Sequence, residues 1–425
     1  MSTNTTPDKD RLYLFIASCI SLCVTSMIFI IRGDVEGSLT TEYHLTKEQM
    51  GEIWGPAFLG FTIAIFFCGA LIDKLGMKRM HVLSAVGFIA GTLMILFAPQ
   101  PDMADGTTVS GIFSTTGTTM LYGGFLLMGL AQGTVEGVIN PLIATMYKDR
   151  KAHMLNVLHA FWPLGLIIGG ILALIMGALD LAWQIKIGII IVPSLVYLFM
   201  ALQKEYPQTE RVAANISTGS MFKACLNPLF ILLWFCMWLT AATELAPDQW
   251  FPSIMKELTG LQGTMFLVYT AGLMFVLRFF FGGVVHKHSP FLVLTICAVL
   301  VFVGLYWLGS LDAGSSAIVA FAAATVFGVG KTYFWPTMLG ITAERFPKSG
   351  ALGINLMGGA GMLSIYFMLP IMGKSLDTAG PGEALISVSY LAIALVVIFA
   401  VLFFGFKAKG GYKAEDIEGE GVKAS

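Results

Sequence analysis

The sequence predicts an all-α integral membrane protein with twelve transmembrane helices in two pseudo-symmetric six-helix bundles. Of its 425 residues, 56% are hydrophobic and only 12% are charged, and the mean hydropathy is +0.79. A soluble domain carries about 25% charged residues. The chain instead has about a dozen apolar runs, each near the roughly 20 residues that cross a bilayer core. The composition therefore points to the lipid bilayer as the surroundings, and the net charge of −1 gives no indication of a nucleic-acid partner.

The apolar runs set the order of the predicted elements, and several exceed 25 residues, which indicates tilted helices or helices that extend beyond the membrane. We expect spans at 12–33, 50–72, 80–99, 117–145, 154–178, 183–203, 228–250, 264–285, 291–309, 317–343, 352–373 and 385–406. The longest cytoplasmic loop, 204–227, separates six spans from six. The predicted units are therefore an N-terminal bundle over 1–203, this linker, a C-terminal bundle over 228–406, and a disordered tail over 407–425.

The basic residues predict the orientation. Most of the 25 Lys and Arg residues fall on the N-terminal segment and on every second loop after it. Because cytoplasmic loops carry the excess of Lys and Arg, we expect both termini in the cytoplasm and a multi-pass protein of the cell membrane. Four basic residues lie at membrane depth instead: Arg32, Lys186, Arg278 and Lys331. Lys186 follows a Trp at the outer edge of its span, so we expect it to anchor the helix at the interface.

A short charged turn separates the second and third spans. It holds Gly69, Asp73, Gly76, Lys78 and Arg79 in the spacing Gly-x-x-x-Asp-x-x-Gly-x-x-Arg. Glycine allows backbones to approach closely, and an Asp in this position can cap a helix end or pair with an arginine. We interpret the turn as a gating loop. The alternative is a loop that only holds its positive charges on the cytoplasmic side.

The two halves repeat each other weakly. Asn140-Pro141 in the fourth span corresponds to Trp335-Pro336 in the tenth, and under the same shift Glu136 falls on Lys331. Parallel six-helix repeats build transporters that rock around a central site. The sequence therefore favours a central site between the halves.

Ionisable side chains inside spans are expensive, so each marks a candidate site. Glu136 lies mid-span and has no interface within reach, which favours a functional or ion-paired role. Arg278 and Lys331 are equally central, as ligands or as partners of Glu136 and Glu244. Asp34, a weaker second acid, could simply reach the outer water. The candidate substrate-binding residues are Asn140, Asn156, His159, Trp162, Glu244, Arg278, Lys331, Tyr333 and Trp335.

Four segments carry a resemblance to a known family. The charged turn at 69–79 resembles the signature loop of the major facilitator superfamily, and the resemblance covers about residues 12–406. Segments 129–141, 155–159 and 277–283 are similar to the fucose–galactose–hexose permease branch. The resemblance implies the major facilitator fold in a bacterial inner membrane.

Residue by residue, the resemblance implies a protonatable carboxylate at Glu136, with ligand or interface amides at Asn140 and Asn156. His159 stands where the branch has a sugar-binding Gln, and Arg32 is foreign to the branch's pattern. The first hypothesis is therefore a proton-coupled sugar symporter that works by alternating access. Glu136 takes the proton, and Lys331 pairs with its ionised form.

Two further hypotheses stay open. In one, the substrate is a sugar acid or another organic anion clamped by Arg32, Arg278 and Lys331. In the other, more remote one, a non-transporting protein of the same fold acts as a membrane sensor. We expect no enzymatic activity, cofactor or metal, because the sequence has no Gly-rich phosphate loop and no metal-ligand spacing. We expect a monomer, since one chain suffices to enclose the path.

Overall fold

Helices make up all the regular structure in the described residues, apart from one short 3-10 turn. The computed structural model describes residues 8–104, 106–147, 151–208, 218–281, 288–312 and 314–415. Within this part, 12 helical segments are long and apolar enough to cross a membrane. The elements are α1 (Asp8–Asp34), α2 (Glu36–Glu42), α3 (Lys47–Leu75), α4 (Met77–Leu96), α5 (Thr116–Met146), α6 (Lys151–His159), α7 (Phe161–Ala178), α8 (Trp183–Gly188), α9 (Ile191–Gln203), α11 (Thr218–Cys225), α12 (Pro228–Thr259), α13 (Gly263–Phe281), α15 (Pro290–Gly309), α16 (Ala317–Lys331), α17 (Phe334–Arg345), η2 (Pro347–Ser349), α18 (Gly350–Ala379) and α19 (Pro381–Ala408).

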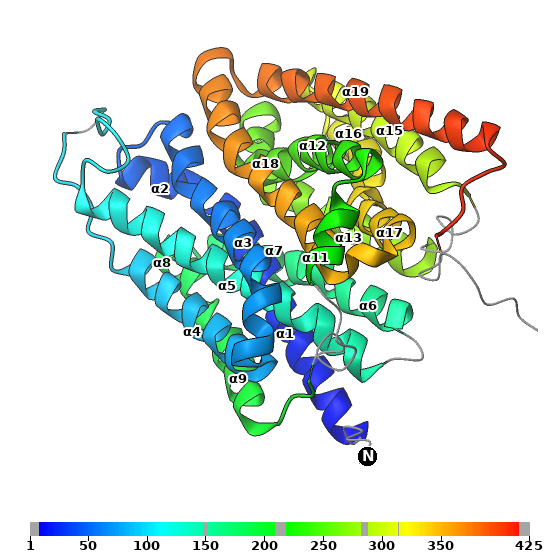
Figure 1. Ribbon diagram of the computed structural model, residues 1–425. Coiled ribbons are helices and arrows are strands. Elements are labelled where there is room, and N and C mark those ends of the chain that lie inside the picture. Colours follow the sequence, from blue (N-terminus) through cyan, green and yellow to red (C-terminus); the bar gives the residue numbers. More distant parts are fainter. Residues whose placement is uncertain are drawn as a thin grey trace, which may run out of the picture.

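The helices form two bundles that lie side by side (Figure 1). In the N-terminal bundle α3 packs along α5, α4 packs against α5 and α9, and α1 packs against α7. In the C-terminal bundle α15 packs against α19 and α16, and α12 packs against α18. The bundles meet mainly where α3 contacts α18, α7 contacts α13 and α1 contacts α12. Any rocking of one bundle against the other must act on these contacts.

Three of the predicted spans are broken rather than continuous. The breaks separate α6 from α7, α8 from α9 and α16 from α17. In each case a proline is the third residue of the second helix: Pro163, Pro193 and Pro336. Proline is tolerated in a first turn because its missing N–H would have no partner there. The break before α17 places Lys331 and Tyr333 at helix ends, where backbone carbonyls are available to side chains.

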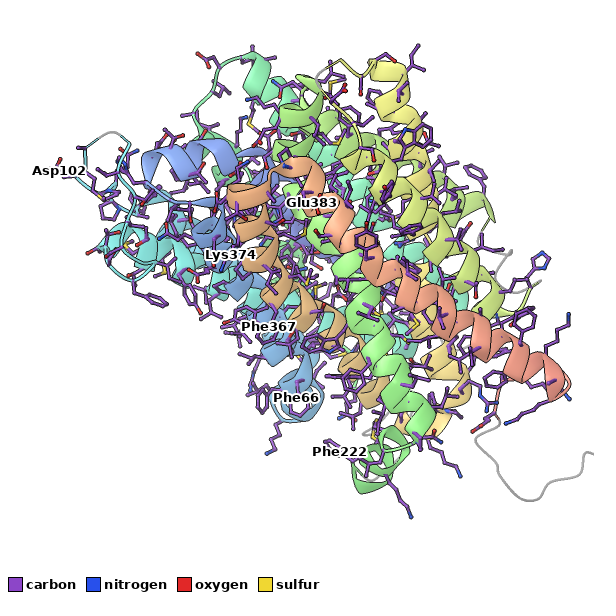
Figure 2. All side chains as sticks on the ribbon, turned by 90° about the horizontal axis from the view of Figure 1, so that it is seen from above. Phe66, Asp102, Phe222, Phe367, Lys374 and Glu383 are labelled. Atoms are coloured by element: carbon purple, nitrogen blue, oxygen red, sulfur yellow. The ribbon has the colours of Figure 1, made fainter. Side chains whose placement is uncertain are left out.

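Small residues allow the bundles to meet closely. A Cβ built on Gly51 of α3 would collide with the backbone of Leu369 and Pro370 in α18. A Cβ on Gly373 of α18 would likewise collide with the backbone of Lys47. Glycine is thus required on both sides of this crossing. Around the periphery of the spans, large apolar side chains such as Phe66 and Phe367 point outward (Figure 2), as expected for a lipid-facing surface.

The segment expected to be a disordered tail is partly attached to the bundle. The helix α19 continues to Ala408, and Tyr412 packs against the rings of Phe291 and Phe406. The Tyr412 hydroxyl donates to Glu344 (2.8 Å), and Arg345 pairs with Glu415 (2.8 Å). An aromatic anchor and an ion pair therefore hold residues up to 415 against α17.

Candidate functional site

A buried ion pair lies inside the C-terminal bundle. The Nζ of Lys331 is 2.6 Å from Oδ1 and 2.5 Å from Oδ2 of Asp248, and both side chains are at most 2% exposed. The same Nζ donates to Thr270 (3.3 Å) and lies 4.8 Å from the ring centroid of Phe327. The expected pairing of Lys331 with Glu136 is therefore wrong for this structure, because α12 in its own bundle supplies the acid.

Arg278 lies beside this pair and is only partly buried. Its Nε donates to the carbonyl of Thr332 (2.8 Å), which is free because α16 ends there. The hydroxyl of Tyr333 donates back to the carbonyl of Leu277 (3.0 Å), which ties the helix break to α13. Within the described residues, no hydrogen bond or ion pair uses the terminal nitrogens of Arg278. Glu244 lies within electrostatic range of the guanidinium, and its Oε2 is buried without a hydrogen-bond partner in the described part.

The N-terminal bundle presents a polar face from α5 and α6. The Nε2 of His159 lies 3.1 Å from Oδ1 of Asn140, and because an amide oxygen can only accept, Nε2 donates. Glu136 is buried one turn before Asn140 on α5. Arg278 is within electrostatic range of His159, so this polar face lies opposite the part of the C-terminal bundle that carries Arg278. The side chain of Asn156 lies outside the described residues.

Aromatic side chains flank this centre in both bundles. Trp162, in the first turn of α7, contacts Phe29 edge to face, with 6.2 Å between the ring centroids. Trp335, in the first turn of α17, packs against α18 at Gly361. Trp162, Tyr333 and Trp335 are all partly exposed.

A second buried cation joins the two bundles. Arg32 is 3% exposed, and its Nε and Nη2 both donate to Oε1 of Gln249 in α12 (3.0 and 2.5 Å). Its guanidinium is therefore shielded from water in this structure. The rings of Phe29, Phe58 and Phe125 surround the guanidinium at 5.6, 4.7 and 5.8 Å from their centroids.

Asp34 has local partners near the outer end of α1. It pairs with Lys186 (2.7 Å) and accepts a hydrogen bond from Thr264 (2.5 Å), so it connects α1 with α8 and α13. Lys186 is thus an ion-pair partner with a 14% exposed side chain; its role as an interface anchor stays a prediction. The part of Asp34 in proton coupling stays a prediction.

The expected gating loop is a sharp turn between α3 and α4. Gly76 adopts φ +83°, a backbone conformation that favours glycine. Lys78 pairs with Glu205 (2.6 Å), and Arg79 is exposed. A hollow of about 410 Å³ lies between this turn and residues 205–208. Gly69 and Asp73 belong to α3, but their side chains lie outside the described residues.

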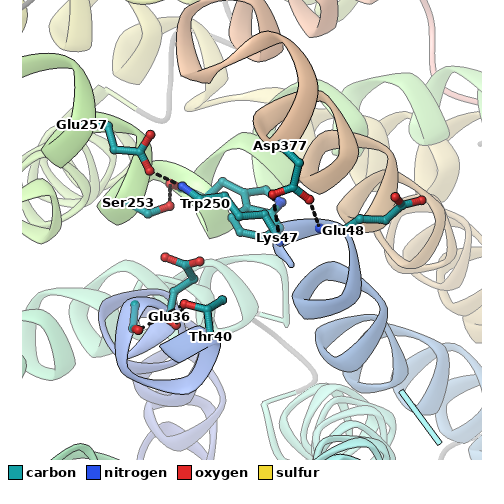
Figure 3. A network of polar contacts seen from close by, with 9 residues as sticks. Glu36, Thr40, Lys47, Glu48, Trp250, Ser253, Glu257 and Asp377 are labelled. Atoms are coloured by element: carbon teal, nitrogen blue, oxygen red, sulfur yellow. Dashed lines mark hydrogen bonds and ion pairs between the residues drawn. The ribbon is translucent and has the colours of Figure 1, made fainter. Parts of the chain in front are cut away.

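Contacts between the bundles also cluster at the end where α3 begins, which the basic residues predict to be the outer end (Figure 3). Lys47 is ion-paired with Glu257 of α12. The backbone N–H groups of Lys47 and Glu48 donate to the carboxylate of Asp377 in α18, at 3.1 and 2.8 Å. These are the first two amides of α3, so a carboxylate of one bundle caps a helix of the other. We call these residues the outer contact.

Glu36 is a buried acid beside this outer contact. It follows the first span directly and is 4% exposed, and its Oε1 has no hydrogen-bond partner within the described residues. Burial raises the pKa of its carboxyl, and the charges of Glu257 and Asp377 add to that effect, while Lys47 opposes it. Closing the outer end therefore places an acid where its charged form is disfavoured.

The spans, the paired bundles and the interior charges define a multi-pass membrane transporter. The family model described as the Major Facilitator Superfamily matches residues 14–359. The chain belongs to this superfamily.

Known relatives agree with this assignment. The gentisate transporter of Corynebacterium glutamicum is 24% identical over 264 residues, which are 60% of this chain and 55% of the relative, so the match spans about half of that protein. The 3-(3-hydroxy-phenyl)propionate transporter of Escherichia coli is 23% identical over 95% of this chain and 97% of its own length. The partially occluded inward-open structure of the xylose transporter XylE from E. coli aligns over 92% of this chain and 98% of its own, with a TM-score of 0.76 and 12% identity. The structural match shows the shared fold.

The structure brings some of the predicted site residues together and separates others. Asn140 and His159 are bonded, and Arg278, Tyr333 and Lys331 gather around the break between α16 and α17. Sequence reasoning did not include Asp248 and Gln249 in the site, although both follow Glu244 on the same helix. The available signal was the four-residue spacing of Glu244 and Asp248, which places two acids on one face of α12.

Proposed function

We propose that this protein is a secondary transporter that carries an aromatic carboxylate together with a proton by alternating access. The observation that carries the proposal is the environment of Arg278: its Nε donates to the carbonyl of Thr332, and its terminal nitrogens form no hydrogen bond with the described residues. A guanidinium binds a carboxylate through two parallel N–H···O bonds. The partly exposed position between the bundles makes Arg278 accessible to a substrate.

The balance of interior charges supports coupling to a proton. Lys186 and Asp34 form a neutral pair, and the remaining interior charges are the cations Arg32, Arg278 and Lys331 and the acids Glu136, Glu244 and Asp248. The ion pair of Lys331 with Asp248 is neutral by itself. Protonation of Glu136 then leaves one excess positive charge, which a monocarboxylate cancels. The expected transport is therefore electroneutral, with one proton for each monoanion.

Two independent arguments support a substrate that carries an aromatic ring. Trp162 in the N-terminal bundle and Tyr333 and Trp335 in the C-terminal bundle are partly exposed aromatic side chains, and aromatic pairs gain energy beyond the area they bury. Two relatives are named as transporters of gentisate and of 3-(3-hydroxy-phenyl)propionate, which are both aromatic acids.

Proton-coupled sugar transport is the second candidate. The bonded pair of Asn140 and His159 beside Trp162 is its support, because amides bind hydroxyl groups and flat rings pack against sugar faces. The two candidates differ in whether Arg278 binds the substrate. A neutral sugar has no carboxylate for the guanidinium to bind.

Binding to the purified protein separates the candidates. Gentisate, 3-(3-hydroxyphenyl)propionate and xylose are each titrated in a thermal-shift assay against wild type, Arg278→Gln and, as a matched control, Arg11→Gln near the N-terminal end of α1. We expect both acids to stabilise wild type and Arg11→Gln, with affinity lowered about 10- to 100-fold in Arg278→Gln, since a hydrogen-bonded charge contributes about 1.5–3 kcal/mol. Stabilisation by xylose, and by neither acid, would refute the proposal.

Transport in proteoliposomes tests the proton. In Glu136→Gln, gentisate exchange should continue, while uptake driven by an inward proton gradient is lost. Gradient-driven uptake by this variant at the wild-type rate would exclude Glu136 as the coupling site.

A further inference from the structure

Arg32 is the buried cation that the proposed function leaves unexplained. Its bonding partners among the described residues are a neutral amide and three phenyl rings, and no carboxylate of that part lies within ion-pair distance. A buried charge without a counter-ion costs several kcal/mol. Such a cost points to a partner that is present in another state of the protein.

The hydrogen bonds of Arg32 show what kind of partner fits. Nε and Nη2 form the side-on edge of the guanidinium, and both donate to the single oxygen of the Gln249 amide. This is the edge to which a carboxylate binds with two oxygens. Gln249 thus occupies the carboxylate position with half of the required acceptors and without the charge.

Gln249 reaches this position only while the bundles are in contact. It belongs to α12, and its Nε2 donates to the carbonyl of Phe29 in α1 (3.3 Å). A Cβ on Gly33 would collide with the backbone oxygen of Gln249, so the two helices touch closely at this point. Phe29, Phe58 and Phe125 belong to α1, α3 and α5 and stay with Arg32 when the bundles separate. Separation therefore removes Gln249 and exposes a cation lined by aromatic faces.

We infer that Arg32 is a second carboxylate site. A carboxylate binds there from the outside when the bundles separate, and Gln249 displaces it when they close. The inference rests on the proposed function and deepens it, because the phenyl rings and the side-on edge together select an aromatic monocarboxylate. Substrate and Gln249 compete for one edge of one guanidinium. Closure of the outer end therefore expels the carboxylate toward Arg278 and cannot leave it behind at Arg32.

Separate measurements of substrate affinity on the outer and the inner side of the membrane test this site. Radiolabelled gentisate uptake is recorded in right-side-out and in inside-out vesicles, which report the half-saturating concentration on the outer and the inner side. In Arg32→Gln the outer value should rise more than 10-fold, and the inner value should change less than 2-fold. Gln249→Ala, which removes the competitor, should lower the outer value several-fold. Gln249→Glu supplies a permanent carboxylate and should abolish uptake from the outside.

Controls keep the site and the proposed function distinguishable. Gln100→Ala, in the outer loop, is the matched control for Gln249 and should behave as wild type, and Arg32→Lys replaces Arg32→Gln if the latter fails to fold. Equal effects of the Arg32 variant on both sides, or no effect on either, would overturn the outer site. In that result the proposed function still stands if Arg278→Gln lowers gentisate affinity. Absence of gentisate binding and uptake by wild type itself would refute the proposed function.

Discussion

Removal of the acid from the buried ion pair of the C-terminal bundle should destabilise the protein strongly. Asp248→Asn leaves Lys331 charged and 1% exposed, and loss of one partner of a buried pair costs about 3–5 kcal/mol. The hydroxyl of Thr270 at 3.3 Å and the ring of Phe327 at 4.8 Å contact Lys331 in wild type as well, so they cancel from the difference between the two proteins. We therefore expect the free energy of unfolding to fall by about 3–5 kcal/mol.

Reversible unfolding in mixed micelles of dodecyl maltoside and dodecyl sulfate, followed by tryptophan fluorescence, measures this loss. The double variant Asp248→Asn/Lys331→Gln removes both charges and should return to within about 1 kcal/mol of wild type. Glu205→Gln breaks the exposed pair with Lys78 and should cost less than about 1 kcal/mol. Equal stability of Asp248→Asn and wild type would refute the reasoning, and so would a double variant as unstable as the single one.

Two further predictions concern the outer contact. Because burial raises the pKa of Glu36 in the closed arrangement, closure should be strongest in acid and should weaken as the pH rises through that raised value. In Glu36→Gln the spin-label distance between the outer ends of α3 and α18 should not change between about pH 4 and pH 8. A pH response like that of wild type would contradict this prediction. Gly373→Ala places a methyl group against the backbone of Lys47 and should hold the outer end open, seen as a longer spin-label distance than in wild type, whereas an unchanged distance would show that the crossing relaxes.

The spans were predictable from sequence because bilayer thickness and hydropathy fix them nearly alone. The breaks within spans were not. Pro163 and Pro336 lie in first turns just after a break, whereas Pro141 and Pro247 lie inside α5 and α12 without interrupting them. A proline removes one hydrogen bond in either case, and the packing of neighbouring helices decides whether the helix continues.

The partners of the interior charges were predictable only in part. The repeat predicts that Lys331 stands at the position equivalent to Glu136, but equivalence between bundles says nothing about contact. Lys331 ends α16, and its side chain reaches only as far as α12 and α13 of its own bundle. Gln249 gave no signal at all, since a neutral amide in an apolar helix is unremarkable until its partner is known.

Two adjacent residues of α12 show how one helix can serve both stability and motion. Successive side chains on a helix point about 100° apart, so Asp248 turns toward Lys331 within its bundle and Gln249 turns toward Arg32 across the boundary. Rocking of the bundles leaves the first contact intact and must break the second. The charge that stays paired therefore holds the C-terminal bundle together through the cycle. The cation that loses its amide is the one that becomes available, at the moment the outer end opens, for an anion arriving from that side.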